Sequence, residues 1–416
     1  MASPIELDFN KTSSGVMYVD INSCFAIVEQ QANPLLRYKP LAVVAYNTPR
    51  GCILAASVEA KKLGVKTGMR VKEARVFCPS LLTILTDPNK YRAIHLSLQQ
   101  LLSQYTPKLS ARSIDEFALN LVNTPSQKRN LFLVAEEIKQ RIKKEIGDYL
   151  TVSVGLAPSY FLAKTASNLH KPDGLDEINH RNYLKIYQKL SLTDLTGIGS
   201  QNSLRLNSVG IYTVVDFYHA SPRKLRRAFH STVSSQQWYL RLRGWEVDDV
   251  DWPTKSFGHT YSLPQPLDKE KITPILSKLV EKLGSRMRQA GYQAKGVHLG
   301  LMFQDRSYWH RGHNLTGYIS SSSDIYQSAF YLLQSSPNNS LIRNIFITCY
   351  SLVSLSSFQL DLFGKQAKLQ KVTIALDEIE AKWGAFVVTP GTMLGTKDTA
   401  PDRISFSNAP RLPPPL

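Results

Sequence analysis

The chain of 416 residues is poor in cysteine and has no long apolar run. Its four cysteines form no CxxC pair, which argues against a structural zinc site and a disulfide framework. No stretch approaches the roughly 20 consecutive apolar residues that a membrane-spanning helix needs. Residues 1–15 are polar and carry acidic side chains, unlike a secretory signal. We therefore expect a cytoplasmic protein.

Acidic residues are also few relative to basic ones. Lysine and arginine total 50 against 33 aspartate and glutamate residues, a formal net charge of +17. Such a surplus attracts polyanions, of which nucleic acid is the first candidate and an anionic membrane surface the second. The chain is too long for one compact core, so two to four domains are expected.

The first part of the chain has the element order of a ferredoxin-like sheet. Residues 16–21 form an apolar, β-rich run that we interpret as a buried strand. A helix is predicted over residues 53–62. Residues 108–121 predict a strand hairpin, residues 131–146 have the apolar spacing of a helix, and residues 151–156 alternate as a strand does. In a split βαβ sheet of this order, the first strand lies beside the central hairpin.

Acidic side chains stand at the ends of two of these elements. Asp20 lies at the end of the first strand, while Asp115 and Glu116 interrupt the hairpin region. The expected adjacency of the two elements would bring the three carboxylates together. Phosphoryl transfer with two Mg²⁺ ions uses carboxylates that converge on metals about 3.5–4 Å apart. The alternative is that these acids are ordinary solvated turn residues.

Later segments change in character. A turn at residues 197–199 (GIG) precedes a helix-compatible run, and the Ser-Pro pair at 221–222 opens another helix. Residues 245–253 are acidic and are interpreted as a linker. An α/β unit is predicted over residues 256–350. A Ser-rich tail follows, and its Pro-rich end at residues 411–416 is expected to be disordered.

Four local motifs together resemble those of the Y-family (UmuC-like) translesion DNA polymerases. Residues 19–29 (VDINSCFAIVE) and 113–116 (SIDE) are similar to the two catalytic motifs of that family. Residues 55–69 (AASVEAKKLGVKTGM) are similar to its fingers motif. Residues 154–174, with VGLA and AKTASNLHKPDG, are similar to the end of its palm. The motifs follow the family order within about residues 16–350, and this joint match is specific.

The resemblance implies a role for each matching residue of the site. Asp20, Asp115 and Glu116 match the catalytic, metal-binding carboxylates, and the carbonyl of Ile21 matches a backbone ligand. The implied cofactor is Mg²⁺, as two ions. Phe25 matches the aromatic steric gate, whose ring under C2′ of the incoming sugar leaves no room for a 2′-hydroxyl. Without the motif, Phe25 would be interpreted as a core aromatic residue.

The implied contacts to the incoming dNTP depart partly from the family pattern. Lys61 and Lys171 match cations that contact the triphosphate. Cys24 stands beside the gate, where the family often has an aromatic residue. Val58 and Lys61 occupy positions where DinB-type members typically have Tyr and Arg, and lysine offers a point charge in place of a bidentate guanidinium. The pattern is closer to UmuC-type members.

DNA contacts are expected from the segment after the palm. Gly197 and Gly199 lie where the family's thumb has helix–hairpin–helix turns, in which small residues let backbone N–H groups approach phosphates. The helix opened by the Ser-Pro pair carries four cations, which are Arg223, Lys224, Arg226 and Arg227. Beside a phosphate-binding turn these cations are expected to contact DNA, and a solvated helix face is the alternative.

A short motif follows the α/β unit. Residues 359–363, which are Gln359, Leu360, Asp361, Leu362 and Phe363, resemble the bacterial sliding-clamp-binding pentapeptide. Leu362 and Phe363 would fill a hydrophobic pocket, and Gln359 would form a hydrogen bond beside it. Tethering to a clamp raises the effective concentration of the enzyme at the primer end. The alternative is an amphipathic turn packed on the preceding domain.

We therefore predict an α+β multidomain fold, a right-hand polymerase. It has a ferredoxin-like palm, small fingers, a helical helix–hairpin–helix thumb and an α/β little finger. The expected boundaries are residues 13–23 and 87–178 for the palm, 24–86 for the fingers, 179–245 for the thumb, 246–256 for a linker, 257–350 for the little finger and 351–416 for the tail.

The resemblance implies a DNA-directed DNA polymerase of low fidelity that acts in translesion synthesis, DNA repair and the SOS response to DNA damage. Its partners would be primer–template DNA, dNTPs and the sliding clamp, with a UmuD-like accessory subunit and a recombinase filament as further partners and no membrane. We expect a nucleoid-associated location in the bacterial cytoplasm. Two alternatives stay open: a non-catalytic DNA- and clamp-binding regulatory paralogue, and a palm-fold nucleotide cyclase, which needs no thumb, little finger or clamp peptide.

Overall fold

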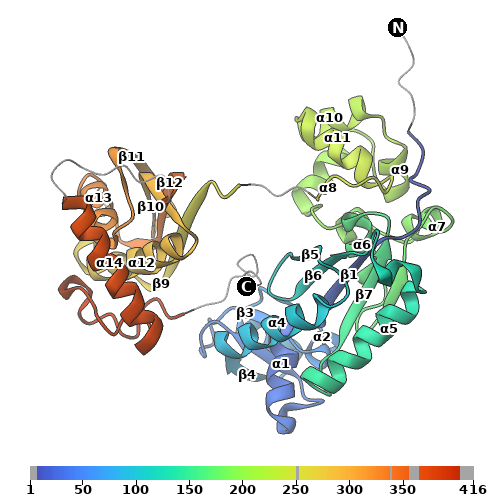
Figure 1. The fold of residues 1–416 in the computed structure, drawn as a ribbon, viewed down its shortest axis with the longest axis horizontal. Coiled ribbons are helices and arrows are strands. Elements are labelled where there is room, and N and C mark those ends of the chain that lie inside the picture. Colours follow the sequence, from blue (N-terminus) through green and yellow to red (C-terminus); the bar gives the residue numbers. More distant parts are fainter. Residues whose placement is uncertain (1–6, 250–252, 338–339, 356–364, 403–416) are drawn as a thin grey trace. The chain divides into compact units, whose positions relative to one another are not determined.

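The computed structural model describes residues 7–249, 253–337, 340–355 and 365–402. The chain forms two compact units, and the boundary between them falls between Val250 and Asp251, inside the predicted linker (Figure 1). Each unit has its own hydrophobic core. Within the described ranges, no helix combines the length and the apolar character that crossing a membrane requires. The predicted clamp motif at residues 359–363 lies outside the described residues.

A five-stranded sheet forms the centre of the first unit, in the order β5-β6-β1-β7-β8. Its strands are β1 (Val16–Ile21), β5 (Leu109–Ala111), β6 (Glu116–Asn120), β7 (Val152–Ala157) and β8 (Leu175–Glu177). Strand β1 runs antiparallel to β6 and β7, and β8 is parallel to β7. This is the predicted ferredoxin-like order with one strand added at an edge, so the first strand does lie beside the hairpin.

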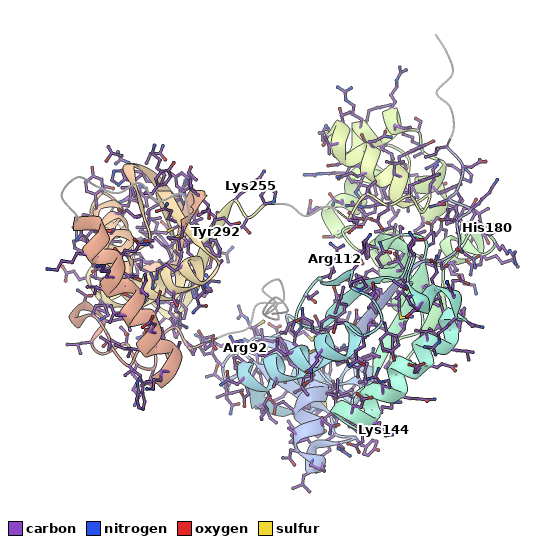
Figure 2. The ribbon with its side chains drawn as sticks, in the orientation of Figure 1. Arg92, Arg112, Lys144, His180, Lys255 and Tyr292 are labelled. Carbon is purple, nitrogen blue, oxygen red and sulfur yellow. The ribbon has the colours of Figure 1, made fainter. Side chains whose placement is uncertain are left out.

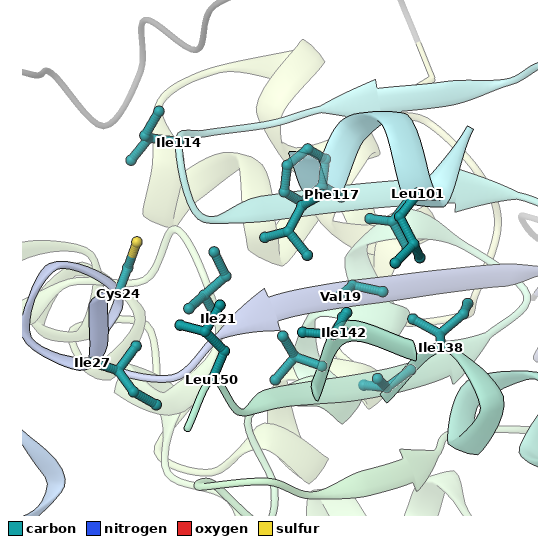
Figure 3. Packing of buried hydrophobic residues seen from close by; sticks show 14 of the residues in the cluster. Val19, Ile21, Cys24, Ile27, Leu101, Ile114, Phe117, Ile138, Ile142 and Leu150 are labelled. Atoms are coloured by element: carbon teal, nitrogen blue, oxygen red, sulfur yellow. The ribbon is translucent and has the colours of Figure 1, made fainter. Parts of the chain in front are cut away.

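One face of this sheet packs against three helices. They are α1 (Cys24–Ala32), α4 (Pro88–Leu102) and α5 (Leu131–Arg141), the last continued by a π-helical segment at Ile142–Ile146. Figure 3 shows this core, in which Val19 of β1 and Phe117 of β6 lie among side chains that include Leu101, Ile138 and Ile142. The burial of this face fixes the register of β1, because a shift by one residue would move its apolar side chains to the other face.

The opposite face of the sheet is covered by α6 (Tyr160–Ser167), which packs on β1 and β7. Side chains alternate along a strand, so Val19 and Ile21 point to the first core, while Tyr18 and Asp20 point to the side of α6. Asp20, a predicted metal ligand, therefore lies under α6. The sequence motif alone did not predict this contact.

The predicted fingers form a small α/β layer. Its sheet has the order β3-β2-β4, with β2 (Leu41–Val44), β3 (Ile53–Ala56) and β4 (Leu82–Leu85), and its helices are α2 (Val58–Lys62) and α3 (Val71–Phe77). The predicted helix over residues 53–62 is therefore wrong in its first half. Ile53 and Ala56 are fully buried and pair with β2, and the side chain of Ser57 accepts a hydrogen bond from Ala60 N–H to start α2. Alanine suits a helix, but burial between two layers favours the strand.

The segment after the palm is helical, as predicted. It contains α7 (Tyr183–Tyr187), α8 (Ser200–Asn207), α9 (Val214–His219), α10 (Pro222–Phe229) and α11 (Thr232–Arg241). A short 3₁₀ turn at Leu192–Asp194 separates α7 from α8, and others in the described residues are Pro34–Leu36, Pro125–Lys128 and Gly391–Met393. The Ser-Pro pair acts as expected, because Ser221 accepts a hydrogen bond from Lys224 N–H and Pro222 is the first helical residue.

The second unit is an α/β sandwich of one sheet and helices. The sheet has the order β11-β10-β12-β9. Its strands are β9 (Ser256–Leu267), β10 (Tyr292–Phe303), β11 (Tyr308–Ile319) and β12 (Ile342–Ser354), and the helices α12 (Lys269–Gln289) and α13 (Ser322–Gln334) contribute to its core. The predicted α/β character of this part is confirmed.

The second unit extends beyond the expected end of the little finger at residue 350. Helix α14 (Lys365–Trp383) and the residues up to Asp402 belong to the same unit. Arg288 on α12 makes two 2.7 Å hydrogen bonds to Asp377 on α14, and Lys282 donates to the carbonyl of Ala400 at 2.6 Å. Trp383 is 67% exposed, so it is not buried against the unit. The C-terminal end of the second unit is thus set by contacts between segments far apart in the sequence, which composition does not reveal.

Candidate active site

The antiparallel register of β1 and β6 places Asp20 opposite Glu116. The backbone N–H of Ile21 donates to the carbonyl of Asp115 at 3.0 Å, which holds the end of β1 against the turn that precedes β6. The structure therefore brings together all three predicted carboxylates. Asp20 is buried, whereas Glu116 and Asp115 are partly accessible.

The turn before β6 fixes the orientation of Asp115. Ser113 is buried and its hydroxyl donates to Asp115 Oδ1 at 2.5 Å. Burial raises the pKa of Asp115 to about 6, and the charges of Asp20 and Glu116 add to the rise against the opposing Ser113 hydrogen bond. A cation bound beside the three groups would favour the ionised form of Asp115.

Two lysines that follow β7 meet the carboxylates. Lys164 on α6 pairs with Asp20 Oδ2 and, at 2.6 Å, with Glu116 Oε1, while Lys171 lies 2.7 Å from the same Oδ2 of Asp20. Burial opposes the charge on Lys164, but Asp20 and Glu116 outweigh it and raise its pKa. Tyr18 donates from its hydroxyl to Glu116 Oε2 at 2.8 Å. The carboxylates are therefore held by cations and a donor from the protein itself.

Sequence reasoning assigned no role to Lys164 or Tyr18. A signal for Tyr18 was present, because residues two apart on a strand share a face and Tyr18 precedes Asp20 by two. Lys164 lies inside a recognised motif, but only the packing of α6 on β1 shows that its ammonium reaches Asp20.

Cys24 and Phe25 open helix α1 directly after β1. The thiol of Cys24 is buried, which raises its pKa, and the charges of Asp115 and Asp20 add to that rise. Phe25 is fully buried, and its ring stacks on Tyr91 with centroids 4.4 Å apart. Tyr91 in turn donates to Glu29 at 2.9 Å. The structure thus places Phe25 in the core next to the carboxylates, and its role as a steric gate stays a prediction.

Lys61 is exposed on α2 and donates from Nζ to the hydroxyl of Ser23 at 2.8 Å. Ser23 precedes α1 with a left-handed φ of 52°. A cavity of about 310 Å³ adjoins this point and is lined by Ser23, Val58, Tyr149 and Pro172, among others. Lys61 therefore contacts a residue that lines this cavity, and Lys171 immediately precedes another lining residue, Pro172.

The predicted DNA-contacting turn is formed and accessible. Gly197 has a φ of 98°, which favours glycine, and buried Ile198 anchors the turn. Gly197 and Gly199 are themselves exposed, and Gly199 is the N-cap of α8. The backbone N–H groups at the start of α8 are thus placed to meet an anion.

The four basic side chains of α10 differ in solvent exposure. Arg223, Arg226 and Arg227 are exposed, but Lys224 is half-buried and donates to the carbonyl of Gly210 at 3.0 Å. One cation outside the predicted set is Arg112, in the turn between β5 and β6 (Figure 2), whose guanidinium lies 4.6 Å from the ring centroid of Tyr160.

The residues present fit divalent cations by their chemistry. Asp20, Asp115 and Glu116, with the carbonyl of Ile21, offer the hard oxygen donors that Mg²⁺ prefers, and burial together with the neighbouring carboxylates raises the pKa of Asp115. Across the ranges that the structure describes, no three Asp, Glu, His or Cys side chains are already gathered as a metal cage.

Comparison with known proteins gives matches along most of the chain. The model of the impB/mucB/samB family matches residues 19–168, and that of the impB/mucB/samB family C-terminal domain matches residues 254–362. A protein of Moorella thermoacetica with the name DNA polymerase IV is 32% identical, over 90% of this chain and 94% of its own. DNA polymerase IV 1 of Bacillus subtilis is 28% identical, over 94% and 96%.

Solved structures agree with this result. A Y-family DNA polymerase chimera of Dbh and Dpo4 superimposes with a TM-score of 0.71 and 26% identity, covering 82% of this chain and 99% of the chimera. An insertion ternary complex of Dbh DNA polymerase gives a TM-score of 0.57 and 25% identity, with the same coverage. The matches span both units and include the strands that carry the carboxylates, so the chain belongs to the impB/mucB/samB family of Y-family translesion DNA polymerases.

Proposed function

We propose that this translesion polymerase transfers nucleotides from dNTPs to a primer 3′-hydroxyl, with Asp20, Asp115 and Glu116 as the residues that hold two Mg²⁺ ions. The pairing of Asp20 with Glu116 across β1 and β6, with Asp115 in the adjoining turn, is the observation that carries the proposal. The ions would lower the pKa of the attacking hydroxyl and stabilise the leaving pyrophosphate. Ser113 and Tyr18 orient two of the carboxylates.

The incoming dNTP would bind beside the start of α1. Lys61 and Lys171 supply two positive charges for the triphosphate, because Lys61 contacts Ser23 at the start of α1 and Lys171 contacts Asp20. The N-terminus of α1 presents unpaired backbone N–H groups and the positive end of the helix dipole, and both favour a bound negative charge. Phe25, the second residue of that helix, would exclude a 2′-hydroxyl, and Cys24 would line the site beside it.

DNA would be held mainly through its backbone. The exposed turn at Gly197 and Gly199 and the exposed arginines of α10 suit contacts with phosphates, which are independent of sequence. The net charge of +17 supports such binding. A polymerase that binds the DNA backbone and contacts the new base pair with few side chains is expected to copy damaged templates with low fidelity.

Residues 359–363 would bind a sliding clamp, and a UmuD-like subunit or a recombinase filament would be a further partner. The support for the clamp is the sequence QLDLF itself, between strand β12 and helix α14. Replacement of Leu362 and Phe363 by alanine should abolish stimulation by a loaded clamp and leave clamp-independent primer extension unchanged.

The two earlier alternatives are less well supported. A nucleotide cyclase has no use for the C-terminal family domain that matches residues 254–362. A non-catalytic regulator has no need for three carboxylates held in register.

Primer extension by the full chain tests the proposal. With Mg²⁺, dNTPs and a primer–template, the wild type should add template-directed nucleotides, and the pair Asp115→Ala with Glu116→Ala should not. Asp305→Ala, in the exposed turn between β10 and β11, is a matched acidic control that should keep activity. Primer–template binding without extension, even with a loaded clamp present, would support the regulator instead.

A further inference from the structure

Two ammonium groups converge on one carboxylate oxygen in this site. Lys164 and Lys171 both contact Oδ2 of Asp20, and Lys164 also contacts Oε1 of Glu116. The Lys164 side chain is 12% exposed, against 34% for Lys171. Lys164 is therefore the inner of the two cations, and it bridges carboxylates from two strands.

The packing of α6 on the palm sheet fixes the position of the Lys164 side chain. Ser159 is the N-cap of helix α6, and its side chain accepts a hydrogen bond from Leu162 N–H. The helix packs on β1 and β7, with Ala163 and Ala166 buried. The Lys164 ammonium also lies 5.1 Å from the ring centroid of Tyr18. These contacts direct a long, flexible side chain to one place.

The oxygens that Lys164 contacts are those a divalent ion would need. A metal ion bound to Asp20 and Glu116 cannot share their oxygens with the ammonium at hydrogen-bond distance, because the two positive charges would repel each other at close range. Without any cation, three carboxylates in a largely buried site would also repel one another. A positive group beside these oxygens is therefore favoured, and either the lysines or the metal can provide it.

We propose that Lys164 is an internal counter-cation that keeps the carboxylates assembled before metal binds and that each metal-binding event must displace. This inference rests on the proposed metal-dependent function and adds a positioning residue to it. Lys171 has a smaller part, because it contacts only Asp20 and is more exposed. Lys164 therefore lowers the affinity of the free enzyme for divalent ions and makes the affinity depend on how easily its side chain can move.

Mn²⁺ binding to the full-length protein, without DNA or nucleotide, tests the proposal. Free Mn²⁺ is measured by electron paramagnetic resonance for wild type, Lys164→Met, Lys164→Arg and Lys171→Met. Lys164→Met should lower the Kd for Mn²⁺ at least about tenfold, because a neighbouring positive charge is removed. Lys164→Arg, which keeps the charge, should stay near wild type, and Lys171→Met should change the Kd less than Lys164→Met.

A second measurement covers the case in which Lys164→Met does not fold. Lysines of the wild type are reductively methylated with and without Mn²⁺ and quantified by mass spectrometry, and Mn²⁺ should increase modification of Lys164. The proposal is overturned if folded Lys164→Met binds Mn²⁺ no more tightly than wild type, if Lys164→Arg binds as tightly as Lys164→Met, or if Mn²⁺ leaves modification of Lys164 unchanged. A wild type that binds Mn²⁺ as expected but extends no primer would contradict the polymerase proposal alone.

Discussion

Asp20 and Glu116 stand opposite each other on neighbouring antiparallel strands, although they are far apart in the sequence. Residues that are directly opposite in an antiparallel pair have Cβ atoms about 4.5–5.5 Å apart. Two like charges at this distance are unfavourable unless something positive lies between them. Lys164 meets that need in this structure.

Tyr18→Phe should weaken metal binding and cost about 1 kcal/mol of stability, because it removes the hydrogen bond that orients Glu116. Thermal unfolding and Mn²⁺ titration measure the two effects. Tyr105→Phe is the matched control, since its hydroxyl donates to Glu137 at 2.7 Å on α5, away from the site. The control should lose similar stability with no change in Mn²⁺ affinity, and equal affinity losses in both variants would contradict the orienting role.

Metal binding should weaken as the pH falls through about 6, because Asp115 takes up a proton there. The folded pKa of Asp115 lies above its ordinary value of 3.8, so between these values the folded protein binds more protons than the unfolded chain. In the absence of metal, the contribution of Asp115 to stability is thus present below pH 3.8 and lost as the pH rises through about 6. Asp115→Asn should raise the metal-free melting temperature at pH 7.5 and abolish activity. A melting temperature below that of wild type at this pH would show that ionised Asp115 is stabilising.

Phe25→Leu should admit ribonucleotides and also destabilise the fold. The ring is fully buried and stacked on Tyr91, so a smaller side chain leaves space under the sugar but loses packing, at a cost of about 1–2 kcal/mol. The ratio of kcat/KM for a ribonucleotide and its deoxyribonucleotide should rise at least about tenfold, as expected when a clash worth about 1.4 kcal/mol or more is removed. Val28→Ala, three residues along α1 and buried in the same core, is a packing control that should leave this ratio unchanged.

The second unit should lose stability in mild acid because of His259. Burial lowers the pKa of His259 to about 4, and the nearby charges of Arg286 and Lys282 add to this. Between pH 4 and 6.5 the unfolded state binds more protons, so stability is full above pH 6.5 and falls as the pH drops through this window. At pH 5 the loss should be about 1–2 kcal/mol. His259→Gln should show a smaller loss between pH 7.5 and 5 in urea unfolding; an equal loss would assign the effect to other groups.

Breaking the contact between Arg288 and Asp377 should loosen the C-terminal helix from the second unit. The pair is bidentate and mostly buried, at 10% and 25% side-chain exposure, so Arg288→Met should cost about 2 kcal/mol and speed amide exchange in α14. Lys271→Met is the matched control, because its pair with Asp268 is exposed and should be worth less than about 0.5 kcal/mol. Unchanged exchange in α14 after Arg288→Met would show that other contacts hold the helix.

The sequence by itself determined the order of elements in the palm and the adjacency of its acidic groups. A short apolar strand that ends in Asp20, and a hairpin interrupted by Asp115 and Glu116, leave few sheets in which both can be buried. Local signals also set helix starts, as Ser221 does for α10. The helix starts depend on short-range chemistry, and the adjacency of the acidic groups follows from the order of the elements, so a single chain reveals both.

Only the tertiary structure decided which other side chains complete the site and where the second unit ends. Ile53 to Ala56 could form a helix or a strand, and pairing with β2 selected the strand. Lys164 reaches Asp20 because α6 packs on the matching face of β1, and α14 joins the second unit because Arg288 meets Asp377. Each of these outcomes depends on contacts between segments far apart in the chain, and the energy of such contacts exists only once both surfaces are formed.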